Sequence, residues 1–122
     1  MEKAQAIAAL AALAQDSRLD VFRLLVRAGP DGLSAGTVAE RLKLAPNTLT
    51  FHFDRLRHAG LVTVRRAGRS KIYAARYSSM RALLAYLTAN CCEGAVEECG
   101  PEQCGPAQPS HAGNKEPELS DP

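Results

Sequence analysis

Four cysteines lie close together near the C-terminal end of this 122-residue sequence. Cys91 and Cys92 are adjacent, Cys99 follows after six residues, and Cys104 after four more. This spacing fits a structural zinc site poorly, because such sites typically place about two to four residues between paired cysteines. Thiolates without a nearby histidine instead select soft metals and metalloids. Three thiolates in a pyramid suit trivalent arsenic, As(III), or antimony, Sb(III), so Cys91, Cys92 and Cys99 are the predicted ligands and Cys104 is a possible extra one.

Other uses of these thiols stay open. One is redox sensing, for which a disulfide from Cys99 to Cys91 or Cys92 is more reasonable than a strained bond between adjacent cysteines. Another is that the thiols are incidental. A protein of a different class, a thiol carrier that hands arsenic to another protein, has no use for the cations described next.

A second group of residues can bind a nucleic acid. Four cations fall within seven residues around a Gly turn, where they can reach a phosphate strand: Arg65, Arg66, Arg69 and Lys71. Upstream, a predicted helix carries polar and aromatic side chains away from its apolar stripe: Asn47, Thr48, Thr50, Phe51 and Arg55. Affinity for duplex DNA comes mostly from cations beside phosphates, and specificity from side chains at base edges. We therefore expect double-stranded operator DNA as a partner, with Phe51 against a thymine methyl group.

Several of these residues also have a simpler interpretation. A basic hairpin tip can serve solubility alone, and Phe51 can turn toward the core. His52 lies beside the apolar stripe and is expected to be a packing histidine with satisfied hydrogen bonds rather than a ligand. Asp54 would oppose phosphate in the groove, so we expect it to pair with Arg57, Arg55 or a cytosine amino group.

The charge of the chain is divided between two parts. Residues 1–90 carry fourteen Lys and Arg against six Asp and Glu, a net charge of +8, and contain no cysteine. Residues 91–122 carry one Lys against seven acids, a net charge of −6. The basic part favours a polyanion such as nucleic acid as its partner. The Gly-, Pro- and Glu-rich end cannot bury enough apolar surface to order itself, so residues 105–122 are expected to form a disordered acidic tail.

The length of the chain allows one domain and excludes large two-domain enzymes. The longest apolar run, around Ile7–Leu13, is far below the ~20 residues needed to cross a bilayer. The N-terminus has no signal-peptide pattern. We therefore expect a soluble, cytoplasmic protein that does not contact a membrane. The sequence shows no Ser/His/Asp set, phosphate loop or C-x-x-C motif, so we do not expect an enzyme.

The sequence predicts mostly helices, with one β-hairpin. Residues 3–14 favour helix, and a second helix begins at a cap, Asp16 or Ser17. Ser34 caps a short helix over 34–43, and Pro46 opens another that ends at Gly60. Residues 61–76 form a predicted β-hairpin, and a last helix covers about 78–92. The predicted inner faces are Leu19, Phe22, Leu25 and Val26; Val38, Ala39 and Leu42; and Leu49, Phe53 and Leu56, while the last helix carries an apolar face of Met80, Leu83, Leu84 and Leu87.

This order of elements is typical of a winged helix-turn-helix, a mainly α fold with a β-hairpin wing. The helix over 46–59 would enter the major groove. The first helix is apolar on nearly its whole surface, which indicates a subunit interface, although the core of one domain can also cover it. We divide the chain into a DNA-binding and dimerisation domain, 1–92, a Cys-containing metalloid-binding segment, 93–104, and the tail, 105–122.

Two stretches resemble the ArsR/SmtB family of metal-sensing winged-helix repressors. The stretch TLTFHFDRLRHAGLVTVRRAGRSKIY is similar to that family's recognition helix and wing through Thr50, His52, Leu56, Ala59, Gly60, Leu61, Val62, Gly68, Arg69 and Tyr73. The stretch ALAQDSRLDVFRLL is similar to the start of the family's second helix through Leu13, Asp16, Arg18, Leu19 and Leu24. The resemblance covers roughly residues 5–90 and implies a homodimer formed through the first and last helices.

The departures from the family pattern narrow the expected ligand. Residues 34–39 lack the Cys-x-Cys of many arsenic sensors, and residues 77–92 lack the Asp and His of the zinc sensors. Asn90, Cys91, Cys92 and Cys99 resemble a subgroup in which Asn-Cys-Cys at the end of the last helix binds arsenite with a third cysteine. The resemblance implies an As(III)-responsive repressor. Methylarsenite, Sb(III), cadmium, lead or an oxidant remain alternative signals.

Overall fold

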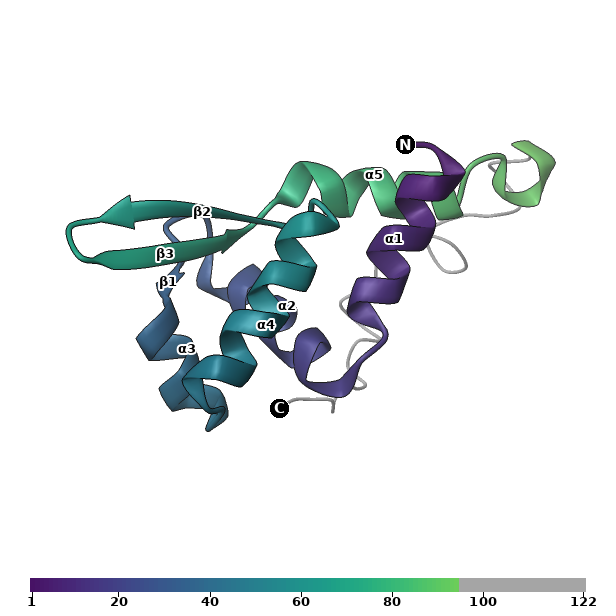
Figure 1. Ribbon diagram of the computed structural model, residues 1–122. Coiled ribbons are helices and arrows are strands. Elements are labelled where there is room, and N and C mark those ends of the chain that lie inside the picture. The colour runs from purple at the N-terminus through teal and green to yellow at the C-terminus, as the bar shows by residue number, and fades with distance from the viewer. Residues whose placement is uncertain (95–122) are drawn as a thin grey trace, which may run out of the picture. The chain divides into compact units, whose positions relative to one another are not determined.

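Helices dominate the computed structural model, which describes residues 1–94 (Figure 1). The elements are α1 (Lys3–Leu13), α2 (Asp16–Ala28), β1 (Leu33–Ser34), α3 (Ala35–Leu42), α4 (Pro46–His58), β2 (Val62–Ala67), β3 (Ser70–Ala75), α5 (Tyr77–Leu87) and a short 3-10 helix, η1 (Cys91–Gly94). Residues 1–87 form one compact unit, and a second unit begins at Thr88. Because the two units are separate, η1 is described by itself.

The helix-turn-helix is formed by α3 and α4, as predicted. The Ser34 hydroxyl caps α3 by accepting a hydrogen bond from the Thr37 backbone N–H at 3.1 Å. The chain leaves α3 through Lys43, which has a left-handed backbone with φ of 56°, and a left-handed residue cannot continue a right-handed helix. Pro46 then occupies the first turn of α4, where its missing N–H costs nothing.

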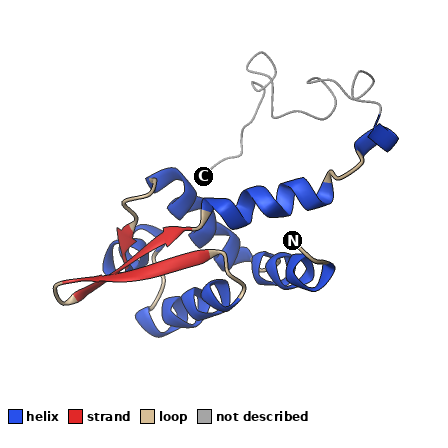
Figure 2. Ribbon diagram, turned by 90° about the horizontal axis from the view of Figure 1, so that it is seen from above, coloured by secondary structure: helices blue, strands red, loops and turns tan. Residues whose placement is uncertain are grey.

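The wing is the hairpin of β2 and β3, which projects from the helices in Figure 2. Gly68, with φ of 65°, makes the turn, and a residue with a side chain is strained in that conformation. The sheet has a third strand, β1, which pairs with β3 in the order β1-β3-β2. Strand β1 was not predicted from the sequence, because a strand of two residues is too short to leave an alternating pattern.

The core confirms the predicted inner face of α4, where Leu49, Phe53 and Leu56 are all buried. One prediction for α2 is wrong. Leu19 is 43% exposed, and Val21 and Leu24 are buried with Phe22 and Leu25. The reason is that α2 packs against α1, α3, α4 and β3 at once, so its buried face is wider than a single stripe and is centred elsewhere.

The start of α2 also differs from the prediction of an Asp16 or Ser17 cap. The N-cap is Gln15, whose side-chain oxygen accepts a hydrogen bond from the Arg18 backbone N–H at 2.8 Å. Gln reaches the same N–H that a shorter capping side chain would reach, so the helix begins one residue earlier and Asp16 lies in its first turn, where a carboxylate is favourable.

Helices α1 and α5 contact each other (Figure 1). Both helices leave large apolar side chains exposed. The side of α1 that meets the core is made of alanines: Ala6, Ala9 and Ala12. Ile7 is 58% exposed on the same helix, and Leu84 is 56% exposed on α5. Within this chain the core therefore covers only the alanine side of α1, and it does not bury these large apolar residues.

The last helix is shorter than predicted. Helix α5 ends at Leu87, and a turn follows before η1, so Cys91 and Cys92 are not in the helix. Asn90 and Cys92 have left-handed backbones, with φ of 57° and 54°, and such residues end a right-handed helix. Residues 95–122, with Cys99, Cys104, most of the predicted segment 93–104 and the whole predicted tail, lie outside the described residues.

None of the helices found in residues 1–94 has the length and apolar character needed to span a bilayer.

Candidate nucleic-acid interface and cysteine pair

The outer face of α4 carries all five of its side chains that were predicted to contact DNA: Asn47, Thr48, Thr50, Phe51 and Arg55 are exposed. Phe51 is 54% exposed, which excludes the alternative that it turns into the core. The Arg55 guanidinium lies over the Phe51 ring, 5.4 Å from its centre, in a cation–π contact. The Thr50 hydroxyl donates to the Pro46 carbonyl oxygen at 3.0 Å and so is partly engaged within its own helix.

Asp54 and His58 are also on this outer face. Asp54 lies 3.8 Å from the Arg57 guanidinium, one of the partners expected for it. Both side chains are about half exposed, so this ion pair contributes little to stability. The ring nitrogen Nδ1 of His58 is 2.7 Å from the Asp54 carbonyl oxygen, which can only accept, so Nδ1 carries the proton.

The inner face of α4 carries a polar contact with α2. His52 is only 5% exposed, and its Nδ1 accepts a hydrogen bond from the Arg18 guanidinium at 3.4 Å. Burial, and then the nearby Arg18 charge, lower the pKa of His52 below its ordinary value of 6.5. Arg18 also donates from Nε to the carbonyl oxygen of Ala12 at 2.7 Å. His52 is thus a buried, hydrogen-bonded packing residue, as expected, and Arg18 connects the end of α1 to α4.

The wing presents its four cations as exposed side chains. Arg66 and Lys71 are directly opposite each other in the antiparallel pair, and like charges in that position repel. Among the residues that the structure describes, no carboxylate pairs with Arg66, Arg69 or Lys71. Arg65 differs, because its guanidinium donates to the Asp31 carbonyl oxygen at 2.9 Å and ties the wing to the loop after α2.

A ring stack joins the wing to α4. Phe53 of α4 and Tyr73 of β3 lie with centroids 3.6 Å apart and planes 3° from parallel. Both side chains are buried, and burial raises the pKa of the Tyr73 hydroxyl above its ordinary value. The stack fixes the orientation of the wing relative to the predicted recognition helix.

The cysteine pair lies in η1. The Cys91 and Cys92 sulfurs are 3.8 Å apart, and no disulfide joins them. The contact with the Cys92 thiol raises the pKa of Cys91. No group of three His, Cys, Asp or Glu side chains able to hold a metal ion is present in residues 1–94. The predicted third ligand, Cys99, lies beyond that range.

Sequence comparison relates the chain to transcriptional regulators. The sequence model of a helix-turn-helix domain family matches residues 13–65. The transcriptional activator HlyU of Vibrio cholerae is 32% identical over 89 residues, which make up 71% of this chain and 80% of that protein. An uncharacterised HTH-type transcriptional regulator of Bacillus subtilis, YceK, is 36% identical over 73 residues, 60% of this chain and 72% of that protein.

Solved structures share the fold. An ArsR-like transcriptional regulator from Rhodococcus sp. RHA1 superposes with a TM-score of 0.65 at 25% identity, covering 75% of this chain and 83% of that one. The structure of HlyU from Vibrio cholerae superposes with a TM-score of 0.60 at 30% identity, covering 76% of this chain and all of HlyU. These matches confirm the predicted winged helix-turn-helix fold and place the chain among regulators rather than enzymes.

Proposed function

Since the chain belongs to the ArsR family of winged helix-turn-helix transcriptional regulators, we propose that it is a dimeric repressor that leaves its operator when As(III) binds its thiols. The observation that carries the ligand assignment is the pair of thiols in η1. The Cys91 and Cys92 sulfurs are 3.8 Å apart, so one soft ion can contact both thiolates. Cys99 completes the proposed set of three ligands, and antimonite is expected to bind the same set.

The DNA part of the proposal is supported by complementary charge. Arg66, Arg69 and Lys71 on the wing have no acidic partner among the described residues. The repulsion between Arg66 and Lys71 is relieved when a phosphate lies between or beside them. The exposed face of α4 supplies Asn47, Thr48 and Phe51 for base edges.

The dimer part is supported by the uncovered apolar side chains on two adjacent helices. Ile7 and Leu10 of α1 and Leu84 and Leu87 of α5 are all exposed in the single chain. A second copy of this chain would bury them in a symmetric interface. Two recognition helices must then be about 34 Å apart to read successive major grooves.

Release follows from linkage between the thiol site and DNA. As(III) held by thiolates just beyond α5, a helix of the proposed interface, favours a dimer geometry in which the spacing of the two α4 helices no longer matches the operator. A coupling of ~1–3 kcal/mol lowers operator affinity by about 5–150-fold. The ligand acts only to the extent that it binds the DNA-free form more tightly.

Two observations favour an alternative in which the protein activates transcription and responds to an oxidant. HlyU is named an activator, and one of its structures is described as the reduced form. A HlyU-like regulator that responds to an oxidant through Cys91 or Cys92 and Cys99 is therefore the alternative.

A run-off transcription assay separates these candidates. The template is a promoter carrying a duplex that this protein enriches from a random library. The proposal predicts less transcript when the reduced protein is added and recovery of transcript with arsenite. More transcript on adding the protein would contradict a repressor, and recovery with peroxide but not with arsenite would show that the signal is an oxidant.

A further inference from the structure

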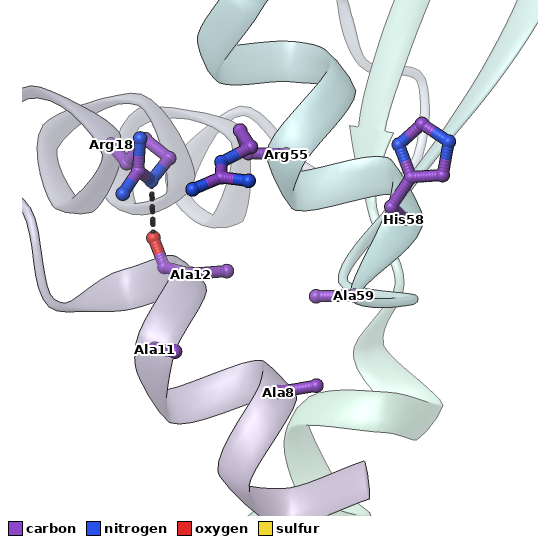
Figure 3. A pocket seen from close by; sticks show the side chains of 7 residues that line it. All are labelled: Ala8, Ala11, Ala12, Arg18, Arg55, His58 and Ala59. Carbon is purple, nitrogen blue, oxygen red and sulfur yellow. Dashed lines mark hydrogen bonds between the residues drawn. The ribbon is translucent and has the colours of Figure 1, made fainter.

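A pocket of about 280 Å³ lies between α1, α2 and α4 (Figure 3). Arg18 of α2 lines it, together with Arg55 and His58 of α4. Alanines make the rest of the lining: Ala8, Ala11, Ala12 and Ala59. The pocket thus joins two permanent positive charges to a small apolar wall, and none of its lining residues is acidic.

No acidic side chain among residues 1–94 balances the charge of Arg18. The residue is only 8% exposed, and a guanidinium buried this deeply is normally paired with an anion. Its side-chain partners are neutral groups, the Ala12 carbonyl oxygen and the His52 imidazole. Within residues 1–94 no carboxylate lies within ion-pair distance, and its other N–H donors have no acceptor. An anion in the pocket would supply the missing charge.

Arg55 supplies a second cation from α4. It is exposed, and its cation–π contact with Phe51 leaves its N–H donors available. A planar guanidinium binds a carboxylate through two parallel hydrogen bonds. The Nδ1–H of His58 donates to the Asp54 carbonyl oxygen, so Nε2 is left to accept a hydrogen bond.

We propose that this pocket binds a small organic carboxylate, with its charged group between Arg18 and Arg55 and its apolar body against the alanines. The volume is just below the ~300–1,000 Å³ of typical small-molecule sites, which limits the ligand to a small body. An inorganic oxyanion would leave the alanine methyl groups without a contact. The site goes beyond the proposed function, because its ligand binds neither through DNA nor through the thiols. Since Arg55 is also a predicted DNA contact, ligand and DNA compete for it.

The test uses benzoate as a probe and its neutral isostere benzamide as the control ligand. Backbone amide NMR spectra of the full reduced chain are recorded during each titration, without DNA. We expect saturable shifts at Ala8, Ala12, Arg18 and Arg55 with benzoate and none with benzamide. Equal shifts with both probes, no saturable shift with benzoate, or shifts with inorganic phosphate but not benzoate would each overturn the proposal.

Two lining residues, Ala11 and Arg55, are exposed, so replacing them leaves the buried core unchanged. Arg55→Gln removes one charge and is expected to weaken benzoate binding by at least about tenfold, because a hydrogen bond to a charged group contributes ~1.5–3 kcal/mol. Ala11→Leu fills the pocket and is expected to abolish binding.

The matched control for Arg55→Gln is Arg57→Gln, since Arg57 is an exposed cation of α4 that lies outside the pocket lining. If Arg57→Gln weakened benzoate binding as much as Arg55→Gln does, the proposed site would be contradicted. DNA binding and arsenite release do not enter this readout, so it can fail or succeed independently of the proposed function.

Discussion

Phe53 and Tyr73 are stacked face to face, with centroids 3.6 Å apart, and this contact joins the predicted recognition helix to the wing. The two residues are twenty positions apart in sequence and come from α4 and β3. Any movement of α4 that keeps the stack therefore carries the wing with it. The stack therefore couples the position of the predicted recognition helix to that of the wing.

The stack predicts a specific loss of stability. Tyr73→Leu removes an aromatic pair worth ~0.5–1.5 kcal/mol beyond its buried area, so the free energy of unfolding in urea should fall by at least that amount. Tyr73→Phe keeps the ring and is expected to change stability much less. Equal losses for the two variants would mean that the hydroxyl, rather than the stack, matters at this position.

The wing cations predict the salt dependence of DNA binding. Replacing Arg66 or Lys71 by Gln should weaken binding to all duplexes alike. It should also reduce the slope of log affinity against log salt by about one for each phosphate that the variant no longer neutralises. Fluorescence anisotropy at several salt concentrations measures this slope. Arg23→Gln, an exposed cation of α2 outside the predicted set, is the control. An unchanged slope in Arg66→Gln would remove the wing from the interface.

The buried His52 predicts that acid destabilises the fold. Because burial and Arg18 lower its pKa in the folded state, the unfolded chain binds the proton more readily. The contribution to stability is therefore complete above the ordinary pKa of 6.5 and is lost as the pH falls below it. Urea unfolding at a series of pH values should show this loss in the natural protein and a smaller one in His52→Gln. His58→Gln, which changes an exposed imidazole of the same helix, should keep the full loss; equal effects of both variants would refute this assignment.

The exposed side chains of α1 and α5 predict the position of the dimer interface. Leu84→Glu or Ile7→Glu places a charge in the proposed interface and is expected to give a folded monomer in analytical ultracentrifugation, because both side chains are exposed in the single chain. Leu19→Glu introduces the same charge at an exposed leucine of α2 and should leave the dimer intact. Monomer formation by Leu19→Glu alone would place the interface on α2.

The strong local signals in the sequence were enough to predict the fold. Ser34, Pro46 and Gly68 each carry the capping or turn property that their position requires, and the α4 stripe of Leu49, Phe53 and Leu56 is buried as its spacing predicts. These features depend on neighbours within one or two turns, so a single sequence reveals them.

Features set by tertiary contacts were missed. Leu19 has the right spacing for the core and is exposed, because four neighbouring elements determine which side of α2 is buried. Strand β1 forms where Leu33 and Ser34 pair with Tyr73 and Ile72 of β3, a contact between segments far apart in sequence. Arg18 was identified only through a family resemblance, since its role depends on Ala12 and His52 together. The end of α5 was placed too late, because the left-handed backbone of Asn90 cannot be inferred from its apolar neighbours.

The central claim is that As(III) binds three thiolates and thereby releases DNA. Its most direct test is anisotropy of a bound duplex titrated with arsenite, for the natural protein and for Cys91, Cys92, Cys99 and Cys104 each replaced by Ser. We expect release of the natural protein and of Cys104→Ser, and no release of the other three variants. Tight DNA binding by the natural protein that arsenite leaves unchanged would contradict the claim.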